Sequence, residues 1–147
     1  SSQITLVDVA ISGDIEALMI PVIELHAAAN ASVKYQSVQD LGPRVWQIGT
    51  TGARVERDAR LTSSAVALGG AYARTRLDSK VIGPGGEAEL IAAYFGSGTQ
   101  GHDFRNLQDH DAPKTTSDLL FKGVRTETSR SPYSGVNPVR PGAAGSG

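Results

Sequence analysis

The feature that most constrains the fold is a corner of small or turn-forming residues that recurs before short alternating stretches. Asn30 precedes residues 32–38, where Val33 and Tyr35 share one face of an expected strand. Similar corners occur in TGARV (51–55) and GGEAEL (85–90), where glycine precedes alanine and an aliphatic residue. The first two corners lie about 22 residues apart, a spacing typical of stacked supersecondary units. The pattern predicts a chain that turns, forms a strand and turns again over the preceding layer.

Other stretches predict further strands and leave little room for helices. Strands are expected at 4–11, at 22–25 after Pro21, at 45–48, and at 65–68 and 71–74 on either side of Gly69-Gly70. In residues 54–61 every even-numbered side chain is charged and the odd-numbered ones are mostly apolar, which predicts a strand with one solvated or salt-bridged face. The best helix candidate is 88–94, and its pattern of apolar residues fits the alternation of a strand as well as the period of a helix. We therefore expect an all-β solenoid, with a β-sandwich as the alternative, organised as a core over 1–143 and a flexible Gly/Ser tail over 144–147.

Composition excludes several functional classes. The formal net charge is -1, from 14 basic and 15 acidic residues that are scattered along the chain, so nucleic acid and anionic membranes are poor candidates as partners. No apolar run approaches the roughly 20 residues of a membrane helix. The absence of cysteine excludes disulfides, thiolate catalysis and cysteine-ligated zinc or iron–sulfur clusters within this chain. With 5% aromatic residues and 17 glycines, small and aliphatic side chains are expected to carry the packing.

The stretch 101–135 carries most of the candidate chemistry. If a strand runs through it, one face carries Phe104, Asn106, Gln108 and His110, and the other carries Arg105, Leu107, Asp109 and Asp111. A metal site would need His110 and carboxylates to converge, with His102 as a third donor. Strand alternation separates His110 from Asp109 and Asp111, so we favour polar ladder contacts inside or beside the coil over a metal site.

The chain resembles the SufB/SufD family of iron–sulfur cluster assembly scaffold proteins, and it is most similar to the SufD branch. The most specific part is QDHDAPKTTSDLLFKGV (108–124) with SRSPYSG (129–135), and ASVKYQSVQDLG (31–42) is similar to an earlier strand of the family. The resemblance implies a right-handed parallel β-helix and a non-catalytic scaffold. It also implies a SufB-like partner subunit and a SufC-like ATPase, in the cytoplasm or, in plants and algae, the plastid. A cluster is then expected only in the assembled complex, with no cofactor bound by this chain alone.

The resemblance also implies which parts and residues matter. The ATPase-docking helical region and a late histidine motif of the family should follow residue 143, so we expect the chain to be a β-helix core truncated at both ends. The residues that match family motifs are candidates for a subunit or cluster-transfer surface: Gln100, Asp103, His110, Ser117, Lys122, Ser129 and Gly135. For Ser117, Lys122, Ser129 and Gly135 we favour a simpler interpretation, in which they form the corners of coils.

Two alternatives remain open at this point. A SufB-like scaffold is the first, although the absence of cysteine argues against it. The second is a polysaccharide lyase or hydrolase, because β-helices also host such enzymes, and Asp109, Asp111 and Lys114 could serve as acid–base groups. A solvated acidic turn before Ala112-Pro113 explains the same residues more simply, so we expect no enzymatic activity. Lys122-Gly123 lacks the glycine spacing of a phosphate-binding loop.

Overall fold

The computed structural model describes residues 2–147, and within them the chain forms eleven strands. The first six strands are β1 (Gln3–Ile11), β2 (Ala17–Met19), β3 (Val22–Ala27), β4 (Ser32–Asp40), β5 (Val45–Val55) and β6 (Arg60–Ala67). The remaining five are β7 (Tyr72–Val81), β8 (Glu87–Gly96), β9 (Gly101–His110), β10 (Thr116–Arg125) and β11 (Tyr133–Val136). The described residues contain no helix long and apolar enough to cross a bilayer.

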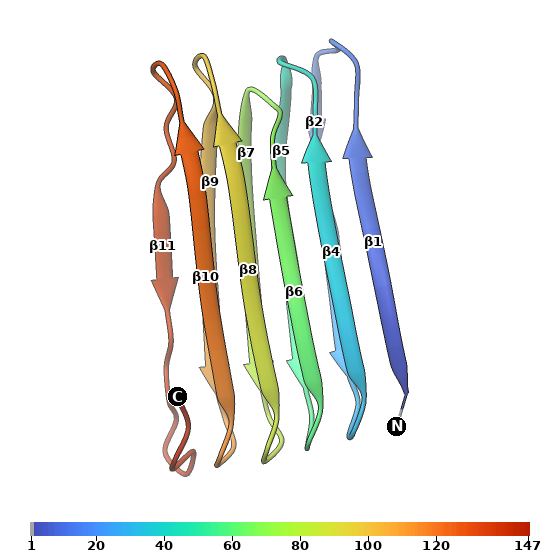
Figure 1. Cartoon of the computed structure of the whole chain (residues 1–147), viewed down its shortest axis with the longest axis vertical. Coiled ribbons are helices and arrows are strands. Elements are labelled where there is room, and N and C mark those ends of the chain that lie inside the picture. The colour runs from blue at the N-terminus through green and yellow to red at the C-terminus, as the bar shows by residue number, and fades with distance from the viewer. Residues whose placement is uncertain (1) are drawn as a thin grey trace.

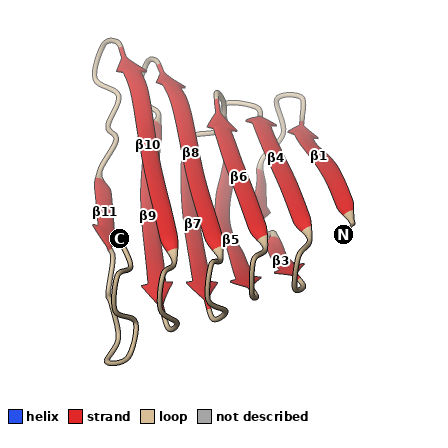
Figure 2. Cartoon of the chain, turned by 60° about the horizontal axis from the view of Figure 1, so that its bottom comes forward, coloured by secondary structure: helices blue, strands red, loops and turns tan. Residues whose placement is uncertain are grey.

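The strands form two facing sheets that are wound as one solenoid. One sheet has the order β1-β4-β6-β8-β10, and the other has the order β11-β9-β7-β5-β2, with β3 also paired to β5. Every pairing between strands is parallel. Strands β2 and β3 both pair with β5, and from β3 onward successive strands alternate between the sheets. In Figure 1 the front strands run upward and the back strands run downward while the chain advances from N to C, which makes the winding right-handed. Figure 2 shows the two layers from below. The expected right-handed parallel β-helix is thus confirmed, and the sandwich is excluded.

The repeat is longer than the corner spacing indicated. Ser32 pairs with Arg60 and Arg60 with Glu87, which are steps of 28 and 27 residues. The expected corner at 51–52 is wrong, because β5 continues without interruption from Val45 to Val55. The expected strand over 54–61 is wrong as well, because the chain turns there, with Asp58 at a φ of 53°.

The true corners at one end of the solenoid stack on one another. Asn30, Asp58, Gly85 and Lys114 each adopt a positive φ, between 53° and 71°, at the turn that precedes β4, β6, β8 and β10 respectively. The backbone of one turn bonds to the next, as in Asn30 N–H to the Arg57 carbonyl at 3.0 Å and Asp58 N–H to the Pro84 carbonyl at 3.0 Å. At Gly85 a Cβ would lie 2.4 Å from Oδ1 of Asp58, an exposed carboxylate that can move aside, so the positive φ is what favours glycine there. The corners expected at Asn30 and Gly85 are therefore confirmed.

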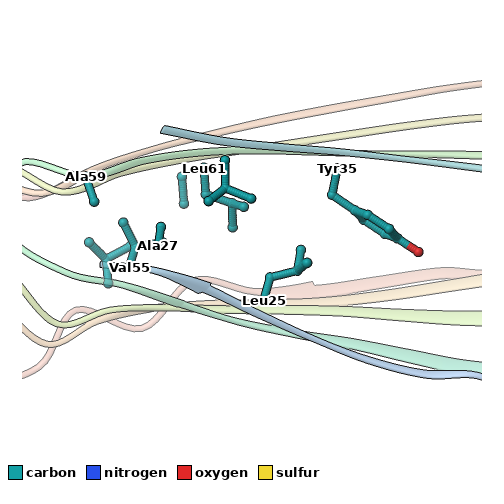
Figure 3. Close-up of a cluster of buried hydrophobic side chains, with 9 residues drawn as sticks. Leu25, Ala27, Tyr35, Val55, Ala59 and Leu61 are labelled. Carbon is teal, nitrogen blue, oxygen red and sulfur yellow. The ribbon is translucent and has the colours of Figure 1, made fainter. Parts of the chain in front are cut away.

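Two apolar clusters fill the space between the sheets. The cluster nearer the N-terminus is aliphatic apart from Tyr35, and it includes Leu25, Ala27, Val55, Ala59 and Leu61 (Figure 3). The second cluster centres on Leu77, Leu90 and Phe104. Phe104 stacks with Tyr94 at 5.6 Å between ring centroids and meets Phe121 edge-on at 5.6 Å. The expectation of small and aliphatic packing therefore holds for the first cluster, and in the second it holds for five of the six buried residues, with Phe104 as the aromatic exception.

Residues 144–147, for which we predict a flexible tail, are hydrogen-bonded to the solenoid in the structure. The Ala144 carbonyl accepts a bond from Lys114 N–H at 3.1 Å, and the Gly147 carbonyl accepts one from Ser117 N–H at 3.1 Å. The Ser146 hydroxyl bonds to Thr115 Oγ1 at 2.8 Å. This segment thus adds a short layer beneath the start of β10.

Candidate functional site

Strand β9 holds three of the sequence-predicted site residues, His102, Asp103 and His110. Its even-numbered side chains from His102 to His110 point into the solenoid and are buried, as the alternation predicted. The neighbouring strands β7 and β11 pair with it on either side, so its inward side chains lie under complete coils rather than at an open edge. The polar ladder that we favoured, with Asn106, Gln108 and His110 inside the coil, is confirmed.

His110 is fully buried, and both of its ring nitrogens are hydrogen-bonded to hydroxyls. Nδ1 lies 2.6 Å from Thr115 Oγ1, and Nε2 lies 2.9 Å from Ser117 Oγ. When Thr115 Oγ1 donates its proton to Ser146 Oγ at 2.8 Å, it can accept the Nδ1 proton of His110. Ser117 then donates to Nε2. Burial lowers the pKa of His110, opposed by the charge of Asp109, which agrees with a neutral ring in this network.

His102 lies at the other end of the same strand. Its Nε2 is 3.3 Å from the Gly69 carbonyl, and its Nδ1 is buried with no hydrogen-bond partner among residues 2–147. Burial lowers the pKa of His102 as well, so the neutral ring is favoured. His110 lies eight positions further along the strand, roughly 26 Å away at about 3.3 Å per residue. The two histidines therefore cannot share one ion, and in residues 2–147 no three His, Cys, Asp or Glu side chains are grouped to hold a metal.

Asp109 and Asp111, at the end of β9, are each paired with a different cation. Asp109 accepts two bonds from Arg140, at 2.8 and 2.6 Å, and Arg140 holds the pKa of Asp109 below its ordinary value. Asp111 lies beyond the end of β9 and pairs with Lys80 at 3.0 Å. These separate ion pairs leave no paired carboxylates free to act as acid and base.

Asp103 is a buried carboxylate on the outer face of β9. It accepts a bond from the Tyr72 hydroxyl at 3.1 Å and from Arg105 at 3.3 Å, and Arg74 lies 3.8 Å away. Burial raises the pKa of Tyr72, and the Asp103 carboxylate raises it further because it stabilises the protonated phenol. Asp103 thus organises three side chains from β7 and β9 on the outer surface.

Of the four residues interpreted as corners, only Ser129 lies in one. Its hydroxyl donates to the carbonyl of Thr126 at 2.8 Å or of Gly96 at 3.2 Å. Ser117 and Lys122 lie within β10, and Gly135 lies within β11, so the corner interpretation is wrong for these three. Lys122 is exposed on the outer face, whereas Ser117 faces His110. Gln100 lies in the turn before β9 and accepts a bond from Ser97 N–H at 2.9 Å.

The family comparison covers the whole chain. A family model described as the SufBD core domain of SUF system FeS cluster assembly matches residues 1–147. The chain belongs to the SufBD family.

Mycobacterial SufBD family proteins are among its relatives. An iron–sulfur cluster assembly SufBD family protein of Mycobacterium leprae is 33% identical over 100 residues, which is 68% of this chain and 25% of the relative. A Mycobacterium tuberculosis member is 39% identical over 72 residues, covering 49% of this chain and 18% of the relative. A second M. tuberculosis member is 26% identical over 131 residues, covering 89% and 16% respectively. The chain thus spans a quarter or less of these SufBD relatives, and no solved structure matches it.

Several residues that shape this SufBD region were not singled out in the sequence. Thr115 and Ser146 complete the His110 network, and Arg140 neutralises Asp109. Tyr94 lies against Gly123, its register partner, and accepts a bond from Ser131 at 2.8 Å. The contact between Tyr94 and Gly123 could have been predicted from the coil length. These two residues are 29 positions apart, which is also the separation of the register partners Glu87 and Thr116.

Proposed function

We propose that this chain is a SufD-type scaffold that takes part in iron–sulfur cluster assembly without performing catalysis itself. The observation that carries the proposal is the match of the SufBD core domain to the whole chain. The sequence contains no cysteine, so no thiolate of this chain can ligate a cluster. That deficit favours the SufD branch over a cluster-building SufB branch.

Its partners under this proposal are a SufB-like subunit and a SufC-like ATPase. Among the residues that match family motifs, Lys122 is the candidate for direct partner contact because it is exposed on the outer face, whereas buried Asp103 would act by holding Arg74 and Arg105 at the surface. His110 is less suited to that role, because both of its ring nitrogens are bonded inside the solenoid. A cluster would then be held by the assembled complex, in which this chain serves as a structural subunit.

Co-expression tests the proposal directly. A protein carrying this sequence at its natural length is expressed with a tagged SufB-like subunit and a SufC-like ATPase, and the eluate is analysed by mass spectrometry and native mass measurement. Stoichiometric recovery of all three chains is the expected result. Failure to associate with either partner would reject the scaffold proposal.

Metal binding by the chain alone provides a second test. We expect anaerobic titration with iron and sulfide to give no cluster absorbance above that of buffer, because the two histidines lie far apart and are buried. A stable absorbance that disappears in a His102→Gln or His110→Gln variant would show that this chain ligates iron. The proposed lack of a cofactor in the isolated chain would then be incorrect.

No specific contact favours the carbohydrate-active alternative. Asp109 and Asp111 pair with Arg140 and Lys80, and Lys114 lies in a turn with a φ of 56°. Incubation with uronate polymers should therefore release no unsaturated product.

A further inference from the structure

Three arginines lie close together on the outer face of the sheet that contains β7 and β9. Even-numbered residues of β7 and odd-numbered residues of β9 point away from the solenoid, because the alternate residues face its interior. Arg74 and Arg76 lie two positions apart on β7, and Arg105 on β9 is the register partner of Arg76. Neighbouring strands are about 4.8 Å apart, so the three guanidiniums gather on one small area, which we call the arginine cluster.

The charges of the arginine cluster are only partly compensated. Arg76 and Arg105 lie directly opposite each other on neighbouring strands, and such a pair of like charges destabilises a sheet. Arg76 Nε donates to Asp78 Oδ2 at 2.7 Å. Arg105 Nε donates to Asp103 Oδ1 at 3.3 Å. Three guanidiniums thus share two carboxylates, and the cluster keeps a surplus positive charge in a chain whose formal net charge is -1.

Buried Asp103 holds two of these guanidiniums in place. Its Oδ2 lies 3.3 Å from Arg105 Nη2 and 3.8 Å from Arg74 Nε, and it also accepts a bond from the Tyr72 hydroxyl at 3.1 Å. The Asp103 side chain is 6% exposed, whereas those of Arg74 and Arg105 are 40% and 47% exposed. The carboxylate therefore orients the two arginines from beneath, while their outer N–H groups remain accessible. Such orientation before binding lowers the entropic cost of binding a ligand.

The arginine cluster lines a hollow on the surface with a volume of about 190 Å³. This volume is smaller than the roughly 300–1,000 Å³ of pockets that hold drug-sized molecules, so the hollow suits a small ligand. Ser134, the register partner of Arg105 on β11, adds a hydroxyl to its wall. Leu107 and Val136, also register partners, form an apolar side. A ligand here meets cationic donors on one side and a short apolar wall on the other.

We propose that the arginine cluster binds a phosphate-type oxyanion, either free phosphate or the phosphate group of a small monoester. Guanidinium groups bind phosphate oxygens through paired N–H donors, and each guanidinium carries five such donors. Within residues 2–147, the Arg76 guanidinium donates only through Nε, and that of Arg74 donates no hydrogen bond. A phosphate monoester carries a charge of about -1.5 to -2 at neutral pH, which is enough to remove the repulsion between Arg76 and Arg105.

Calorimetric titration with inorganic phosphate tests the proposal on the protein at its natural length, without its proposed partners and at constant ionic strength in chloride buffer. Arg76→Gln removes one guanidinium and leaves the contacts of Asp103 in place, and Arg105→Gln removes a second. The matched control is Arg60→Gln, because Arg60 is likewise exposed, at 64% against 53% for Arg76, and pairs with one carboxylate, Glu87, at 2.7 Å. Circular dichroism checks that each variant keeps its strand content.

We expect saturable binding of phosphate, with a dissociation constant that rises at least about tenfold in Arg76→Gln and in Arg105→Gln, since each loses charge-assisted hydrogen bonds. Arg60→Gln should change the constant by less than about twofold. Asp78→Asn should lower it by about threefold or more, because Arg76 is then released from a competing carboxylate. The proposal is overturned by an absence of saturable binding in the millimolar range, by binding that both cluster variants leave unchanged, or by an equal loss in Arg60→Gln.

A second titration, with phenyl phosphate, distinguishes the two sources of the anion. Binding that is tighter than that of inorganic phosphate, and that Val136→Ser reduces to the inorganic value, assigns the site to an organic monoester, since the apolar wall then contributes. Equal binding of the two compounds assigns it to the free anion. Failure of phenyl phosphate to compete with inorganic phosphate would place the two compounds in different sites and overturn the assignment to this hollow. Because no partner is present in either titration, their outcome is independent of the co-expression experiment.

Discussion

Gly123 is the position where the solenoid leaves least room for a side chain. A Cβ built there would lie 1.9 Å from Tyr94 Cζ and 2.2 Å from Tyr94 Cε1. The Tyr94 ring cannot yield freely, because it stacks on Phe104 at 5.6 Å and its hydroxyl accepts a bond from Ser131 at 2.8 Å. Gly123 lies within extended strand β10, so the requirement for glycine is one of space rather than of φ.

The cost of Gly123→Ala follows from the displacement that it forces. Ordinary contact needs about 3.4 Å or more, so the ring or the strand must move by roughly 1.5 Å, and overpacking of this kind typically costs about 1–3 kcal/mol. For a domain of this size that corresponds to a fall in Tm of roughly 2–10 °C. Gly52→Ala is the matched control, because Gly52 also lies within a strand and a Cβ there meets nothing within 4 Å. We expect the control to be neutral or slightly stabilising.

Urea unfolding of a double-mutant cycle separates the clash from other effects. In a Tyr94→Ala background the added methyl group enters space that the ring has left, so Gly123→Ala should be neutral there or stabilise by up to about 1 kcal/mol. The free energies of unfolding should therefore show a coupling of about 1–3 kcal/mol between the two positions. An equal loss in both backgrounds, or no loss in the wild-type background, would refute the steric argument.

Three other predictions concern protonation, a corner hydrogen bond and backbone strain. Burial lowers the pKa of His102 and His110 from 6.5, so below about pH 6.5 the unfolded chain binds protons that the folded chain does not. Denaturant titrations should therefore show the free energy of unfolding falling toward acid pH, by up to about 1.4 kcal/mol per pH unit for each histidine. A flat profile between about pH 7 and 5 would contradict this. Ser129→Ala removes the buried hydroxyl that bonds to the 96 and 126 carbonyls and should cost about 1 kcal/mol in chemical denaturation, whereas an unchanged midpoint would show that the bond contributes nothing. Glu127 has a φ of 58°, which strains a residue with a Cβ, so Glu127→Gly should be neutral or stabilise by up to about 1 kcal/mol in thermal unfolding. Gly98 has a φ of 57°, so Gly98→Ala should destabilise by about 1 kcal/mol. The opposite order of stability would contradict the argument from backbone strain.

The fold could be predicted where local chemistry and strand alternation agree. Asn30 and Gly85 both favour positive φ, and both are true corners because the next strand begins within two residues of them. Thr51-Gly52 looks the same in sequence, but its neighbours on β3 and β7 pair with it along a continuous strand. A glycine in a strand and a glycine at a corner differ only in tertiary pairing, which a local pattern does not contain.

For the candidate site, the sequence predicts which way the side chains point, but it does not predict which groups they bond to. Alternation correctly separated His110 from Asp109. The groups that bind these two residues, however, come from other layers or turns, with Arg140 reaching Asp109 across 31 positions of sequence. The corner interpretation of Ser117 failed for the same reason, because a serine can cap a turn or face a buried imidazole with equal ease.

The length of each coil is therefore the quantity that predicts which residues of this sequence contact one another in neighbouring layers. Asn106 and Gly135 are 29 residues apart, and so are Tyr94 and Gly123, and in both pairs a Cβ on the glycine would come within 2.5 Å of the larger side chain. A large inward residue followed one coil later by glycine is thus a recurring solution to packing between layers. Because each layer contacts only its neighbours, a change in the length of one coil would shift the pairs that span that coil and leave later pairs in register, so each glycine constrains the length of the turns within its own coil as well as the packing.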